Sequence, residues 1–109
     1  MKIFLVGMMG SGKSTLAKMI SKVLSIPYLD MDEEIEAREN KTIKEIFEKN
    51  GESYFRDLES SLLKSLVKQP DSVVVATGGG IVLRPDNREL LKKETTIYLK
   101  VSPQELKKR

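Results

Sequence analysis

The residues most able to carry out chemistry lie at Gly7–Ser14, where the sequence reads Gly-Met-Met-Gly-Ser-Gly-Lys-Ser. A glycine, four residues and Gly-Lys-Ser form the pattern of a loop that binds phosphate groups. Glycines let backbone N–H groups converge on an anion, and the next helix directs its N-terminus at that anion. Lys13 is expected to bind the β- and γ-phosphates, and the Ser14 hydroxyl to bind Mg²⁺. The alternative is a glycine-rich turn that caps a helix and binds nothing.

Two aspartates follow a second predicted strand, in Asp30-Met31-Asp32. In an extended chain their carboxylates point the same way, because side-chain direction repeats every two residues. One carboxylate could hold Mg²⁺ through water. The other could accept a hydrogen bond from a substrate hydroxyl, as a base or as an orienting group. The alternative is that Asp32 only caps the acidic helix that follows.

An arginine and a glutamate stand out on the longest predicted helix. Glu59 falls in the middle of its apolar face, which consists of Phe55, Leu58, Leu62, Leu63 and Leu66. A carboxylate in that position is costly unless it is paired, and Arg56 lies one turn earlier. A guanidinium held by Glu59 suits the planar carboxylate of a substrate. The alternative is a surface ion pair that contributes less than about 1 kcal/mol.

Three glycines, Gly78–Gly80, directly follow a predicted buried strand. Consecutive glycines cost backbone entropy, but they allow the backbone to approach another group closely. We expect that group to be a substrate. The alternative is a tight exit from the strand.

These residues depend on a regular alternation of strands and helices. Strands are predicted at 2–6, 27–30, 72–76 and 95–101, and helices at 13–24, 32–38, 52–68 and 87–93. A further helix is capped by Thr42 and Glu45 and ends near Asn50-Gly51, and another begins at Ser102-Pro103. This order predicts an α/β fold with a parallel sheet, right-handed crossovers and helices on both faces. Ligands of such sheets bind at the carboxyl ends of the strands, so one crevice should collect all the motifs above.

Length and composition narrow the class of protein. The 109 residues suffice for one domain, and 32% of them are charged, mostly Lys and Glu, which suggests a soluble, heat-adapted protein. A net charge of +3 is too small to indicate nucleic-acid binding. Cysteine and histidine are absent, so a general base must be a carboxylate or a lysine. We find no signal peptide or membrane span and expect a cytoplasmic protein.

Together the motifs resemble the shikimate kinase family. The resemblance rests on Gly7–Ser14, on Asp30-Met31-Asp32 and on a longer pattern. That pattern is Arg56, two residues, Glu59, three residues, Leu63, ten residues and then Val-Val-Ala-Thr-Gly-Gly-Gly-Ile-Val at 74–82. Adenylate and gluconate kinases share the first motif and lack the third, so the longer pattern is specific.

The resemblance implies a P-loop kinase fold that transfers the γ-phosphoryl group of ATP to the 3-hydroxyl of shikimate, with Mg²⁺, in aromatic amino-acid biosynthesis. It places Asp30 and Ser14 near the metal, and it makes Lys13, Asp32 and Arg56 the catalytic residues, with Asp32 on the shikimate hydroxyls. Arg56, supported by Glu59, would bind the shikimate carboxylate with backbone contacts from Gly78, Gly79 and Gly80. The implied ATP contacts are Gly10, Ser11, Gly12, Lys13, Ser14, Thr15 and Arg109.

The sequence also departs from the family. It stops at Arg109, whereas members continue into a lid with an arginine, a final strand, a second arginine and a C-terminal helix. If Arg109 were the true end, we would expect weak nucleotide binding, poor turnover and self-association of a kinase that is monomeric when intact. Otherwise the sequence is part of a longer enzyme. Two further alternatives are another small-molecule P-loop kinase and a nucleotide-binding fragment without catalysis.

Overall fold

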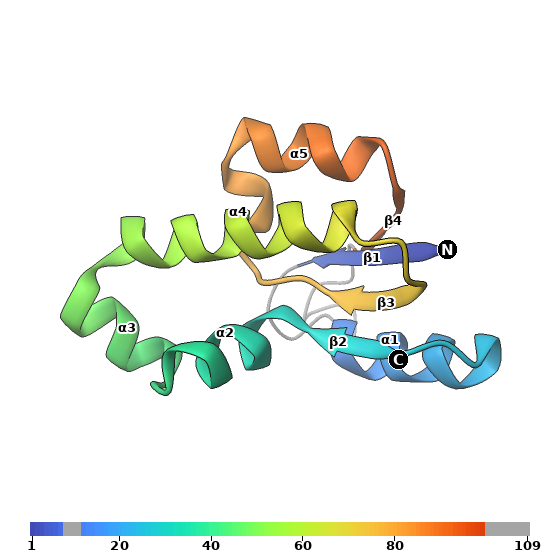
Figure 1. Ribbon diagram of the computed structural model, residues 1–109, viewed down its shortest axis with the longest axis horizontal. Coiled ribbons are helices and arrows are strands. Elements are labelled where there is room, and N and C mark those ends of the chain that lie inside the picture. The colour runs from blue at the N-terminus through green and yellow to red at the C-terminus, as the bar shows by residue number, and fades with distance from the viewer. Residues whose placement is uncertain (8–11, 100–109) are drawn as a thin grey trace, which may run out of the picture.

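A parallel sheet with helices on both faces organises the molecule, as predicted. The computed structural model describes residues 1–7 and 12–99 (Figure 1). The predictions for Gly10, Ser11 and Arg109, and for a helix from Ser102, lie outside these residues. The strands are β1 (Lys2–Gly7), β2 (Tyr28–Asp30), β3 (Val73–Ala76) and β4 (Thr95–Leu99). They lie in the order β2-β3-β1-β4, and all neighbours are parallel.

The helices are α1 (Lys13–Leu24), α2 (Met31–Glu39), α3 (Ile43–Asn50), α4 (Glu52–Lys68) and α5 (Pro85–Lys92), with a 3₁₀ turn, η1 (Ile81–Leu83). In Figure 1, α4 and α5 lie on one side of the sheet and α1 on the other. None of the helices in the described ranges is long and apolar enough to span a membrane.

Alternating side chains of the central strands build two hydrophobic cores. Phe4 and Val6 of β1 pack with the core on the α4 side, whereas Leu5 packs with Ala17 of α1. Strand β3 divides in the same way, since Val73 and Val75 join the first core and Val74 and Ala76 the second. A strand buried on both faces reads as a continuous apolar run, which is why both strands could be recognised from the sequence.

Both ends of helix α3 lie where the capping signals in the sequence predicted them. Thr42 and Glu45 form the predicted capping box, with the Glu45 N–H donating to Thr42 Oγ1 at 3.1 Å and the Thr42 N–H donating to Glu45 Oε1 at 3.0 Å. Helix α3 ends at Asn50 and is followed by Gly51, whose φ of 90° lies in a region that favours glycine. The longest helix, α4, has the bounds that were predicted.

Two other helices begin earlier than predicted. Helix α5 starts at Pro85 rather than Asn87, because the fixed φ of proline suits the first turn of a helix. The Asn87 side chain is buried instead and donates to the carbonyl of Ile81 at 3.0 Å. Helix α2 starts at Met31 rather than Asp32, since Asp30 already serves as its N-cap.

Candidate active site

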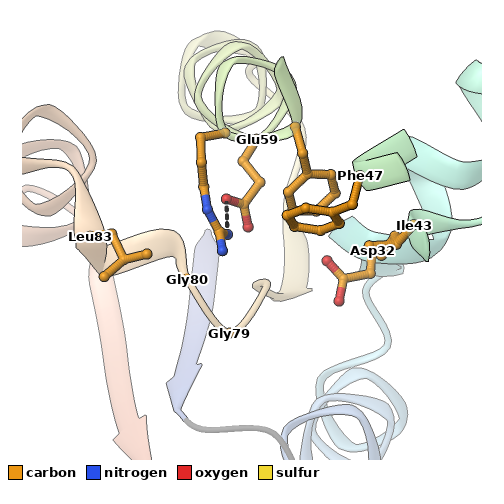
Figure 2. A pocket seen from close by; sticks show the side chains of 9 residues that line it. Asp32, Ile43, Phe47, Glu59, Gly79, Gly80 and Leu83 are labelled. Carbon is orange, nitrogen blue, oxygen red and sulfur yellow. Dashed lines mark hydrogen bonds and ion pairs between the residues drawn. The ribbon is translucent and has the colours of Figure 1, made fainter. Parts of the chain in front are cut away.

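Five of the predicted site residues, namely Asp32, Arg56, Glu59, Gly79 and Gly80, line one pocket at the carboxyl ends of β2 and β3, whereas Lys13, Ser14, Thr15, Asp30 and Gly78 are not part of its lining. Its volume is about 520 Å³, and Figure 2 shows Asp32 on one side of it and Leu83 on the other. Helices α2, α3 and α4 and the segment after β3 all contribute to the wall. The lining residues are Asp32, Ile43, Phe47, Phe55, Arg56, Glu59, Gly79, Gly80 and Leu83.

The predicted pair of Arg56 and Glu59 is present in this wall. Arg56 Nη1 donates to Glu59 Oε1 at 2.8 Å, and the Glu59 side chain is 1% exposed. Arg56 Nε also lies 3.3 Å from Glu52 Oε2. Burial raises the pKa of Glu59, and the nearby charge of Arg56 opposes this effect. The buried carboxylate is therefore a support that fixes a guanidinium at the edge of the pocket.

Two phenylalanines hold the same guanidinium from another direction. Arg56 Cζ lies 5.4 Å from the ring centre of Phe55 and 6.0 Å from that of Phe47. The two rings are 5.1 Å apart. A cation beside aromatic faces is attracted electrostatically. The part played by Phe47 was not predicted from the sequence, where its only signal is an aromatic residue one turn after Ile43 on α3.

The three glycines do not all have the expected role. A Cβ on Gly78 would lie 2.8 Å from Asp32 Oδ1 and still closer to Glu59 Oε2, and one on Gly80 would lie 2.5 Å from Arg56 Cζ. The close approach at these two positions is therefore to side chains of the protein, and the expectation that it is to a substrate needs this correction. Only Gly79 has open space around its Cβ position, with nothing within 4 Å. Backbone contacts from the three glycines to a substrate stay a prediction.

Asp30 holds the junction of β2 and α2. Its Oδ1 accepts the N–H of Glu33 at 3.1 Å, while Oδ2 accepts the Ser14 hydroxyl at 2.9 Å and the Tyr28 hydroxyl at 3.4 Å. The helix cap is thus Asp30, and the alternative that gave this role to Asp32 is wrong. Asp30 and Asp32 do not alternate along one strand, as was predicted, because helix α2 begins at Met31 between them.

Asp32 nevertheless reaches the pocket from the first turn of α2. Burial raises its pKa to about 6, the negative charges of Asp30 and Glu59 add to this shift, and Lys13 opposes it. Its Oδ1 atom is buried and has no hydrogen-bond partner in the described parts of the chain. A buried carboxylate oxygen without a donor is costly, so this site favours a proton or a hydrogen-bond donor beside Asp32.

The described end of the phosphate loop lies beside these carboxylates. Gly12 has a φ of 88°, which favours glycine, and no side chain of the described residues caps α1, leaving its N-terminus suited to an anion. Lys13 Nζ donates to the Gly7 carbonyl, and Thr15 is exposed on the first turn. Burial lowers the pKa of Lys13, against the charges of Asp32, Asp30 and Glu59.

Ser14 and Asp30 form a donor set that fits Mg²⁺. A hydroxyl and a carboxylate are oxygen ligands, and Mg²⁺ bound with nucleotide phosphates needs only one or two carboxylates from the protein. Within residues 1–7 and 12–99, no group of three or more Asp, Glu, His or Cys could hold a metal by itself. The site thus suits a metal that arrives with phosphate ligands.

The sequence is similar to those of known kinases. The family model for shikimate kinase matches residues 9–109. The bifunctional shikimate kinase/3-dehydroquinate synthase of Thermotoga maritima is 61% identical over 109 residues, which are 100% of this chain and 22% of that protein. The shikimate kinase of Aquifex aeolicus is 43% identical over 102 residues, 93% of this chain and 60% of that protein.

Solved structures lead to the same family. A shikimate kinase from Acinetobacter baumannii in complex with shikimate matches with a TM-score of 0.90 and 39% identity, over 99% of this chain and 60% of that one. A gluconokinase from Sinorhizobium meliloti matches with a TM-score of 0.51 and 18% identity, and so shares the fold alone. The chain spans 22% of the bifunctional relative and little more than half of single-function kinases such as those of Cupriavidus pinatubonensis (54%) and Ralstonia nicotianae (55%).

Proposed function

The chain belongs to the shikimate kinase family, and we propose that it transfers the γ-phosphoryl group of ATP to the 3-hydroxyl of shikimate. One observation carries this proposal. The guanidinium of Arg56, fixed by a buried glutamate, and the carboxylate of Asp32, with one buried oxygen that lacks a donor, line the same pocket near Lys13. Such a pocket can bind a small acid by its carboxylate and orient one of its hydroxyl groups.

Arg56 is the proposed anchor for the carboxylate. A guanidinium has five N–H donors, and Glu59 and Glu52 engage Nη1 and Nε. Nη2 makes no hydrogen bond within the described ranges and is the group that would donate to the substrate carboxylate. Because the charge is already held in place, little side-chain entropy is lost when a carboxylate binds.

Asp32 is the proposed group on the reacting hydroxyl. Its ionised carboxylate would accept the hydroxyl hydrogen bond and take the proton as the oxygen attacks phosphorus. With a pKa of about 6, Asp32 is mostly ionised at neutral pH and is more basic than an ordinary aspartate. No histidine is needed for this step.

Lys13, Ser14 and Asp30 are the proposed residues for the nucleotide side of the site. Lys13 would bind the β- and γ-phosphates, and Ser14 and Asp30 would hold Mg²⁺, Asp30 through water. When bound, Mg²⁺ neutralises charge on the phosphates during transfer. Gly10, Ser11, Gly12, Thr15 and Arg109 stay predicted contacts to ATP. We also propose a cytoplasmic location, where ATP is available, and a monomeric intact enzyme.

The experiment is an assay of ADP release from MgATP, with and without shikimate. ADP release that depends on shikimate and saturates with it would support the proposal. Release with another hydroxy acid but not with shikimate would indicate a different small-molecule kinase. Nucleotide binding, measured by calorimetry, without ADP release under any condition would indicate a nucleotide-binding module.

A further inference from the structure

We propose that Arg84 is a positioning residue, which clamps the glycine loop onto α4 and so fixes Arg56 for the substrate carboxylate. This inference rests on the proposed function, because it takes Arg56 to bind the carboxylate of shikimate. The contacts of Arg84 themselves do not depend on that function. Arg84 lies between η1 and α5, four residues after Gly80. Its Nη1 atom lies 2.8 Å from Asp57 Oδ1 and 3.3 Å from Ser60 Oγ, both on α4.

The two partners on α4 directly follow the residues of the supporting pair. Asp57 comes after Arg56, and Ser60 comes after Glu59. A single guanidinium therefore holds the helical turn that presents Arg56 to the pocket. The charge of Arg84 also acts on Glu59, whose pKa is raised by burial and lowered by Arg56 and Arg84.

The other end of the clamp is the contact between Gly80 and Arg56. A Cβ at Gly80 would lie 2.5 Å from Arg56 Cζ, so backbone and guanidinium are already in close contact. The 3₁₀ turn connects Gly80 to Arg84, and the Leu83 N–H stabilises this turn by donating to the Gly80 carbonyl at 3.1 Å. A shift of this turn relative to α4 would move the surface against which Arg56 lies.

The exposure of the clamp separates its role in positioning from a role in stability. The side chains of Arg84 and Asp57 are 35% and 68% exposed, and exposed ion pairs contribute little to folding. A binding site, in contrast, needs its groups held within about half an ångström. Loss of the clamp should thus weaken substrate binding without unfolding the protein.

The test replaces Arg84 by methionine, which keeps length and removes the charge. Arg84→Met should raise the KM for shikimate about three- to tenfold, and change kcat and the KM for MgATP less than about twofold. Asp57→Asn should also raise the KM for shikimate. The charge-swapped double variant Arg84→Asp, Asp57→Arg should restore the shikimate KM to within about twofold of the wild type.

Arg38 offers a matched control. It forms an exposed ion pair with Glu34, also at 2.8 Å, on a helix surface away from the pocket lining. Arg38→Met should leave both KM values unchanged. If Arg84→Met raised the KM for shikimate and the KM for MgATP equally, a positioning role would be overturned. An unchanged KM for shikimate in an active enzyme would overturn it as well.

A readout without substrate separates this inference from the proposed function. The Nε–Hε NMR signal of Arg56 should be sharp in the wild type and in Arg38→Met, and shifted or broadened in Arg84→Met. An unchanged signal would overturn the clamp even if shikimate were the substrate. A changed signal in a protein that does not use shikimate would support the clamp and reject the function.

Discussion

Glu59 shows how a costly residue can be useful in a site. A carboxylate with a side chain that is 1% exposed must have a partner, and Arg56 is held in place because it is that partner. Phe47 and Phe55 add faces against which the guanidinium lies. The arginine is therefore ordered before any substrate binds.

Replacement of Arg56 by alanine should raise the KM for shikimate about ten- to hundredfold, because charge-assisted hydrogen bonds to the carboxylate are lost. ATP binding should change little, since Lys13 and Ser14 lie on another element. Steady-state kinetics with each substrate varied in turn would measure both effects.

Arg56→Lys is the control for geometry in that series. Lysine keeps the charge but lacks the planar fork, so it should recover only part of the loss. An equal loss of affinity for both substrates would contradict the assigned role.

Asp32 should make activity depend on pH. Only its ionised form can take a proton, so kcat/KM should rise as the pH passes about 6 and level off above that value. Asp32→Asn should lose most activity and this rise together. A profile that stays flat between pH 5 and 7 would count against Asp32 as the base.

The same pKa also predicts an effect on stability. Folding raises the pKa of Asp32 from 3.8 to about 6, so the folded state binds the proton more tightly than the unfolded chain. Ionisation therefore reduces stability as the pH rises between these values. Allowing for partial exposure, Asp32→Asn should be about 1–2 kcal/mol more stable than the wild type at pH 7, and nearly equal to it below pH 4. Urea unfolding at the two pH values would measure this.

Among the elements, the loop after β3 shows that glycine can serve neighbouring side chains rather than a ligand. Gly78 leaves room for the carboxylates of Asp32 and Glu59, and Gly80 leaves room for Arg56. The loop joins β3 to η1 and lies against side chains of α2 and α4, so its small residues allow these elements to pack closely. Gly79 alone borders open space.

Gly80→Ala should displace the Arg56 guanidinium, because the added Cβ would overlap with it and a side-chain end yields more easily than backbone. Affinity for shikimate should fall about tenfold or more, and stability should fall by about 1–2 kcal/mol because Glu59 loses its partner. Calorimetry and urea unfolding would measure the two effects.

A double-mutant cycle provides the control for Gly80. In the Arg56→Ala background, Gly80→Ala should cost almost nothing in stability, since the group that it meets is gone. Gly79→Ala, which meets nothing within 4 Å, should leave stability nearly unchanged. If Gly80→Ala lowered the free energy of unfolding equally in both backgrounds, the contact with Arg56 would not be the cause of the loss.

Considered as a whole, the molecule brings charges from separate elements to one place. Asp30 ends β2, Asp32 lies on α2 and Glu59 on α4, and all three act on the pKa of Lys13. The parallel sheet makes this possible, because all of its strands end at the same edge. Nucleotide and acceptor sites can then be adjacent and still depend on different residues.

Ligand-induced stabilisation should reveal this division. Each of MgATP and shikimate, at about 100 times its Kd, should raise the Tm by on the order of 10 °C for a domain of this size. Arg56→Ala should abolish the shift caused by shikimate, and Lys13→Ala the shift caused by MgATP. If either variant lost both shifts, the two sites would not be separable in this way.

The features that could be predicted from the sequence are those that depend on neighbours along the chain. The buried strands, the capping box at Thr42, the bounds of α4 and the pairing of Arg56 with Glu59 all follow from spacings of a few residues. Short-range hydrogen bonds and helical periodicity determine such features, so the parallel fold and most of the pocket could be inferred. The predicted start of α5 at Asn87 was wrong, because Pro85 was not recognised as the first residue of the helix.

Tertiary structure alone decided which distant residues meet. Phe47 beside Arg56, Gly80 against the same guanidinium, Ser14 on Asp30 and Arg84 on Asp57 all join different elements. The packing of helices and loops across the sheet depends on the shape of the whole core, which no local period encodes. The sequence by itself predicted the charged residues of the pocket, Asp32, Arg56 and Glu59, whereas packing decided which aromatic and glycine residues surround them.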